Sequence, residues 1–215
     1  MNKEERQVYV LLTDSGTVLG RMIKWYTKQP LSHASLVLDQ ELQEIYSFGR
    51  KKPSNPFIGG FVRESLKSSL LLDASCALYR CSVSSSVYTR LQRHVDEMRQ
   101  RQDQYKYSVW GLVGVAMNRA WSRDNAFFCS QFVATVLQEN GAVRLEKPPA
   151  LTTPGDLAAL EELAPIFRGS VRELLEQWRE AASQQPTYTG PQRAAGRSRH
   201  ELAVTSPAAA LTTAG

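Results

Sequence analysis

The chain has 215 residues, of which 42% are hydrophobic, so it is long enough for one domain with an ordinary core and some appended segments. Its 26 basic and 21 acidic residues give a formal net charge of +5 and are interspersed, which argues against a nucleic-acid-binding surface. No run of about 18 apolar residues occurs, so we expect no transmembrane segment.

The beginning of the chain and its cysteines indicate a cytoplasmic location. A charged stretch, Met1–Arg6, leads into the apolar run Val8–Leu12, which is too short for the core of a signal peptide. The chain holds three cysteines, an odd number that favours reduced thiols. Cys76 and Cys81 have no further Cys or His nearby, so we expect them to be small buried side chains and expect no metal and no cofactor.

The first part of the chain predicts strands with one helix between them. The expected elements are a strand at Val8–Leu12, a turn at Thr13–Gly16, a helix over Val18–Tyr26, and a hairpin of strands His33–Leu38 and Glu44–Phe48. Pro30 ends the helix, and a loop rich in Gly and Pro spans Gly49–Gly60. Short strands are expected at Leu70–Leu72 and Ala77–Val83.

The second part predicts helices. Ser84–Ser86 supplies N-cap residues for a long helix that ends near Tyr105. Further helices are expected at Val109–Met117 (a close-packed helix or a turn), at Cys129–Asn140 with Gly141 as its stop, from Pro154, and around Val171–Trp178. From Ser183 onward Ala, Thr, Pro, Gly, Ser and Gln dominate, so residues 183–215 are expected to be a disordered tail.

Cys129 and His33 form the pair that can carry chemistry. Cys129 opens an apolar helix, where unpaired backbone N–H groups and the helix dipole stabilise a thiolate and can form part of an oxyanion hole. With an imidazolium nearby, these effects can lower a thiol pKa from about 8.5 to roughly 3.5–7.5. Ser122, Asp124 and Asn125 are alternative caps for this helix. Taken alone, the cysteine and the histidine each also fit a structural role.

Several segments resemble the circularly permuted branch of the NlpC-like papain-fold hydrolases, which also includes lecithin–retinol acyltransferases. The matching stretches are Gly16–Gly20, Leu31–Leu38, Tyr46-Ser47-Phe48, Phe128–Val133 and Thr153–Leu157, within a region from about Val8 to Leu157. The resemblance implies an α+β fold in which an antiparallel sheet or half-barrel packs against helices, including the one that carries the nucleophile. The catalytic domain would then be residues 1–182.

The resemblance also implies roles for individual residues. Cys129 would be the nucleophile, His33 the general base, and Ser47, on the strand that follows the histidine, the group that orients the imidazole. Glu44 lies three residues earlier and is therefore expected on the opposite strand face. The triplet Arg50-Lys51-Lys52 follows the same strand and could attract a carboxylate or phosphate, although such a run is also typical of solvated surface.

The expected function is that of a cysteine-dependent amide or peptide hydrolase that acts through a thioester on a small peptide, amide or acyl substrate. One alternative is a lipid-directed acyltransferase or thioesterase of the same superfamily. Another is a papain-like scaffold that binds a partner without catalysis. Ser47 keeps that last alternative open, because a hydroxyl orients an imidazole more weakly than a carboxylate does.

Overall fold

The computed structural model describes residues 5–14, 16, 21, 29–50, 59–68, 71–107 and 126–184. These residues form an α+β fold, built on a six-stranded sheet in the order β4-β3-β2-β1-β5-β8, in which all neighbouring strands are antiparallel. The strands of this sheet are β1 (Glu5–Thr13), β2 (His33–Val37), β3 (Ile45–Arg50), β4 (Gly59–Glu64), β5 (Ser75–Ser84) and β8 (Ala164–Ser170). The α+β class and the antiparallel sheet expected from the sequence are confirmed.

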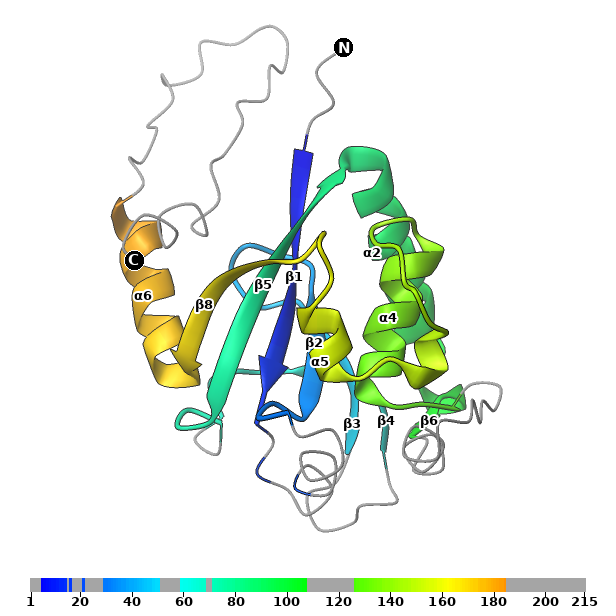
Figure 1. Cartoon of the computed structure of the whole chain (residues 1–215), viewed down its shortest axis with the longest axis horizontal. Helices are drawn as coiled ribbons and strands as arrows, with labels where there is room; N and C mark the ends of the chain where they lie inside the picture. The colour runs from blue at the N-terminus through cyan, green and yellow to red at the C-terminus, as the bar shows by residue number, and fades with distance from the viewer. Residues whose placement is uncertain are drawn as a thin grey trace, which may run out of the picture.

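Helices cover both faces of the sheet, α2 and α4 on one side and α6 on the other (Figure 1). The helical segments are α2 (Ser85–Gln100), η1 (Gln102–Gln104), α4 (Cys129–Glu139), η2 (Pro149–Leu151), α5 (Pro154–Ala158) and α6 (Val171–Gln184). A parallel pair of short strands, β6 (Lys106–Tyr107) and β7 (Ala126–Phe127), precedes α4. No helix in these described stretches is both long and apolar enough to cross a membrane.

The core that positions α4 is aromatic. Phe48 of β3 is fully buried, and its ring lies 5.1 to 6.0 Å, centre to centre, from the rings of Phe61, Tyr105, Phe127 and Phe132. Tilted and edge-on contacts of this kind suit the charge distribution of aromatic rings. Since Phe132 lies one helical turn after Cys129, this cluster holds the first turn of α4 against the sheet.

Several elements agree with the sequence. β1, β2, β3 and β5 contain or closely match the expected strands, and the Ser84 hydroxyl accepts from the Val87 N–H to cap α2. The helix α4 spans Cys129–Glu139 and stops at Gly141, whose φ of +72° is a left-handed conformation that favours glycine. Of the other expected elements, Val109–Met117 lies outside the described residues, as do most of the helix expected over Val18–Tyr26 and all of the expected tail except Ser183 and Gln184, which belong to α6.

Other expectations were wrong. Leu71 and Leu72 lie in a turn rather than a strand, since the Leu71 N–H donates to the Ser68 carbonyl and the Ala74 N–H to that of Leu71. The expected loop at Gly49–Gly60 begins and ends inside strands, and β4 and β8 were not predicted. α2 ends at Gln100, before the expected Tyr105, because its buried positions stop at Met98 and an exposed polar stretch follows.

Substitution of Gly141 by alanine is expected to destabilise the protein by about 1–2 kcal/mol, the cost of placing an L side chain in the left-handed region. The nearest atom to an added Cβ is an arginine nitrogen at 3.7 Å, so the cost comes from the backbone and not from a clash. Urea unfolding followed by circular dichroism measures it. Gly141→Asn should cost less, because asparagine tolerates this conformation. An equal loss for both variants would contradict this explanation.

Candidate active site

Cys129 and His33 lie together at one end of the sheet. His33 begins β2, where the Ser32 N–H donates to the Thr13 carbonyl at 3.1 Å and fixes the entry of the chain into the strand. Cys129 is the first residue of α4 and is only 2% exposed. The Cys129 thiol and the His33 side chain lie close enough to shift each other's pKa. The structure therefore brings together the two residues that the sequence singled out, although they are 96 positions apart.

The surroundings of Cys129 favour its thiolate form. Burial alone would raise the pKa of the thiol, but the charge and hydrogen bond of His33 and the backbone N–H groups of Ala34 and Ser130 outweigh it, so the pKa is lowered. The N-cap residue Phe128 makes no side-chain capping bond. Ser122, Asp124 and Asn125, the caps considered from the sequence, lie outside the described residues. The Phe128 side chain therefore does not compete with the Cys129 sulfur for the positive end of the α4 dipole.

The group that orients His33 is Glu64, which the sequence did not indicate. The His33 Nε2 lies 2.8 Å from the Glu64 Oε1, and the two side chains are only 18% and 21% exposed. With Nε2 engaged by the carboxylate, Nδ1 is the ring nitrogen left to face the thiol. The expectation that Ser47 orients the imidazole is corrected: its hydroxyl donates to Glu64 Oε1 at 2.7 Å, and the carboxylate lies between Ser47 and the ring.

The register of the sheet explains how Glu64 reaches His33 across a strand. Glu64 pairs with Ile45 on β3, and its side chain lies over β3 toward β2. This path crosses Ser47 and Gly49, which have small side chains or none. A Cβ added at Gly49 would lie 3.8 Å from Glu64 Oε1. The small residues of β3 therefore leave room for the carboxylate.

The histidine and the glutamate stabilise each other's charged form. Burial would lower the pKa of His33, but the nearby Glu64 carboxylate and Cys129 raise it well above its ordinary value. Burial would raise the pKa of Glu64, but the His33 charge and three hydrogen bonds lower it to about 2. At neutral pH the raised pKa of His33 and the low pKa of Glu64 favour an imidazolium beside a carboxylate, and the lowered pKa of Cys129 favours its thiolate.

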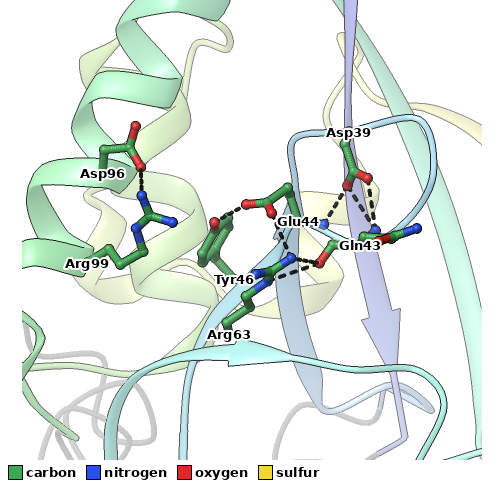
Figure 2. A network of polar contacts seen from close by, with 7 residues as sticks. All are labelled: Asp39, Gln43, Glu44, Tyr46, Arg63, Asp96 and Arg99. Carbon is green, nitrogen blue, oxygen red and sulfur yellow. Dashed lines mark hydrogen bonds and ion pairs between the residues drawn. The ribbon is translucent and has the colours of Figure 1, made fainter.

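Glu44 belongs to a separate polar network, which lies beside the start of β3 (Figure 2). It accepts a hydrogen bond from the Tyr46 hydroxyl and pairs with Arg63 at 2.7 Å, while Asp39 accepts from the backbone N–H groups of Gln43 and Glu44. Arg63 directly precedes Glu64, so its ion pair also holds the end of β4 against the β2–β3 hairpin. The expectation that Glu44 lies on the face opposite Ser47 agrees with its contacts to Tyr46 and Arg63, a cross-strand pair on that other face.

The remaining site expectations are tested only in part. Arg50 is the last residue of β3 and pairs with Gly59, whereas Lys51 and Lys52 lie outside the described residues. Their role as a substrate-binding triplet stays a prediction. Within the described part of the chain, no group of three or more His, Cys, Asp and Glu side chains could hold a metal ion.

Iodoacetamide is expected to alkylate Cys129 at pH 7 at least tenfold faster than Cys76 or Cys81, because only the thiolate reacts. All three are buried free thiols, so the other two are matched controls. Burial, aided by Glu173 and Glu162 respectively, raises the pKa of Cys76 to about 12 and that of Cys81 to about 11. Time-resolved peptide mass spectrometry measures each rate. Equal rates at the three cysteines would contradict the lowered pKa of Cys129.

Comparison with known proteins adds no relative: no protein-family model and no curated protein matches the sequence. The chemistry of the site therefore rests on its own geometry. That geometry is a cysteine at a helix N-terminus, a histidine close enough to lower its pKa, and a partly buried glutamate in hydrogen-bond contact with the imidazole. Such an arrangement suits nucleophilic catalysis at a carbonyl carbon.

Proposed function

We propose that the protein is a cysteine-dependent hydrolase that cleaves an amide or peptide bond through a thioester intermediate. Cys129 is the nucleophile, His33 the general base and acid, and Glu64 the group that orients the imidazole. The observation that carries the proposal is the placement of His33 between Cys129, whose pKa it lowers, and Glu64, which is in hydrogen-bond contact with its Nε2. No cofactor or metal is needed for this chemistry.

The fold supports the proposal, since an antiparallel sheet packs against the helix that the cysteine begins. We extend it to the permuted NlpC-like branch of the papain fold, in which the histidine also precedes the cysteine along the chain. Glu64 removes the reason for favouring a non-catalytic scaffold, because the site has the carboxylate that Ser47 could not replace. A reducing compartment such as the cytoplasm would keep the thiol active.

The proposed reaction begins when the thiolate attacks the carbonyl carbon of the amide. A C–S bond forms, and the carbonyl electron pair moves to the oxygen, which backbone N–H groups in the first turn of α4 can stabilise. The His33 imidazolium gives its proton to the leaving nitrogen as the C–N bond breaks, which leaves a thioester on Cys129. His33 then takes a proton from water, which attacks the thioester, and the C–S bond breaks to release the acid and restore the thiolate.

An acyltransferase would form the same thioester but pass the acyl group to an acceptor other than water. A cavity of about 740 Å³ lies between α6 and the residues that flank Glu64, with Leu42, Leu66 and Trp178 in its lining. This lining includes Glu64 but neither Cys129 nor His33, so the cavity is not where the thiolate meets a carbonyl. Since hydrolysis needs no acceptor besides water, we place it first and transfer second.

The test is to trap the acyl-enzyme. Wild-type protein is mixed with a panel of small amides, peptides, esters and thioesters, and its intact mass is recorded within seconds, followed by peptide mapping. We expect an acyl adduct on Cys129 that decays in water. Cys129→Ala and His33→Ala should form none, whereas Cys76→Ala, which leaves the site intact, should behave as wild type. Decay that requires an added amine or alcohol would favour transfer, and the absence of any adduct across the panel would contradict both functions.

A further inference from the structure

Two serine hydroxyls, on different strands, donate to the carboxylate of Glu64. The Ser35 Oγ on β2 lies 2.6 Å from Glu64 Oε2, and the Ser47 Oγ on β3 lies 2.7 Å from Glu64 Oε1. Both serines are completely buried. Each serine hydroxyl can rotate to point its proton at the carboxylate. Both contacts are therefore charge-assisted hydrogen bonds, which are stronger than hydrogen bonds between neutral groups.

The distribution of donors around the two oxygens favours the ionised form of Glu64. Oε1 accepts from His33 and Ser47, and Oε2 accepts from Ser35. A protonated carboxyl would carry its own O–H, which needs an acceptor, so at least one of these donors would have to turn away. A carboxylate satisfies all three donors at once.

Other charged groups stand farther back from Glu64. Arg63, its neighbour in the chain, is engaged by Glu44 and the Gln43 carbonyl. Glu41, Lys67 and Arg179 line the cavity that Glu64 borders on the α6 side, and Asp103 lines a groove on the side of η1. These groups are of mixed sign. Apart from His33, the groups in hydrogen-bond contact with the carboxylate among the described residues are the two serines.

We propose that Ser35 and Ser47 are positioning residues that hold Glu64 as a carboxylate aimed at His33, and that the protonation state of the His33–Cys129 pair depends on both hydroxyls. The inference rests on the proposed function and assigns Ser47 a part in it through Glu64, rather than through the imidazole. If either hydroxyl is lost, the carboxylate of Glu64 loses a hydrogen-bond donor and is less stabilised. A less stabilised carboxylate supports the His33 imidazolium less, so Cys129 keeps its proton to a higher pH.

The experiment is the pH profile of Cys129 alkylation by iodoacetamide between pH 5 and 10, read by peptide mass spectrometry. Ser35→Ala and Ser47→Ala should each react roughly tenfold more slowly than wild type at pH 6, and the double variant more slowly still. All rates should converge near pH 10, where every form is thiolate. A merely structural loss would not give this convergence.

Conservative and matched variants make the result specific. Ser35→Thr and Ser47→Thr keep the hydroxyl and should retain most of the wild-type profile. Thr152→Val removes a buried hydroxyl that donates to the Pro148 carbonyl instead, and should leave the profile unchanged. Should an alanine variant not fold, Ser→Cys at that position keeps the size but weakens the donor, and its profile should shift in the same direction.

The failures of the two proposals are distinguishable. A wild-type Cys129 that titrates like an ordinary thiol would overturn the proposed hydrolase, and this inference with it. A wild-type Cys129 with a low pKa, whose profile the serine variants reproduce, would overturn only the role of the serines. A shift that threonine does not restore would also count against the hydroxyls.

Discussion

Replacement of Glu64 by glutamine is expected to reduce turnover at neutral pH by roughly 10²- to 10⁴-fold, the range that a positioned acid–base group contributes. The glutamine side chain has nearly the same shape, so the effect isolates the charge. Without a carboxylate against Nε2, the pKa of His33 falls from its raised value, because burial, which lowers it, is no longer opposed by the largest favourable contribution. The neutral imidazole then ceases to stabilise the thiolate.

The alkylation of Cys129 provides a readout of the same variant that does not depend on a substrate. In Glu64→Gln we expect the rate at pH 6.5 to fall at least tenfold, since the protonated thiol would dominate at that pH. Glu44→Gln is the matched control, because Glu44 is a carboxylate just before β3 that pairs with Arg63 and not with His33. Identical alkylation by wild type and Glu64→Gln would show that Glu64 has no influence on the thiol.

The largest expected effect on stability comes from Phe48. Its truncation to alanine should cost about 3–5 kcal/mol, the usual range for a fully buried phenylalanine, and lower the melting temperature by on the order of 10 °C. The ring contacts four others, which come from β4, α4, β7 and the residue that follows η1. The substitution would thus leave a cavity where α4, the helix that Cys129 begins, meets the sheet.

Chemical unfolding of Phe48→Ala and Phe167→Ala compares the loss of unfolding free energy at this core position with the loss at a less buried phenylalanine. Phe167 lies on the edge strand β8 and is only partly buried, so the same substitution there should cost less. Because Phe48 supports α4, we also expect its variant to alkylate Cys129 more slowly under conditions where it is still folded. Equal unfolding free energies for the two variants would contradict the central place of the aromatic cluster.

The sequence pointed to Cys129 and His33 as neighbours because each carries a strong local signal. Cys129 begins an apolar helical pattern that ends at a glycine, and His33 begins a run of apolar residues typical of a strand. Such signals depend on residues within one or two turns of the chain. These signals were enough to identify the helix and the strand. The two residues were then paired because a thiol and an imidazole can act together in catalysis.

Glu64 could not be found in this way. It is 31 residues from His33 in sequence, and the contact depends on the register between β2, β3 and β4. β4 itself was missed, because Gly59-Gly60 resembles the loop before it and only Phe61-Val62 indicates a strand. Ser47 was assigned the role because it lies on the strand next to His33. The structure shows that the side chain from one strand farther reaches over it.

β8 was missed for a related reason. It contains Pro165, which sequence rules associate with turns, and an edge strand tolerates a proline because one side of its backbone makes no ladder bonds. The error at Leu70–Leu72 is the opposite one, because a strand was expected there and the structure has a turn. Leu71 and Leu72 are apolar, but they are only partly buried and form a turn that packs beside α6 rather than within the sheet. Local composition therefore gave a wrong prediction of secondary structure in both segments.

The most direct test of the account is the charge state of His33, followed through its ring nitrogen chemical shifts by NMR from pH 5 to pH 10. Both nitrogens of His33 should remain protonated through neutral pH in the wild type, since the raised pKa of His33 keeps an imidazolium between Cys129 and the Glu64 carboxylate. Cys129→Ala, which removes the anionic sulfur, should titrate at a lower pH. A wild-type His33 that loses its proton near pH 6.5, unaffected by Cys129→Ala, would contradict the paired site.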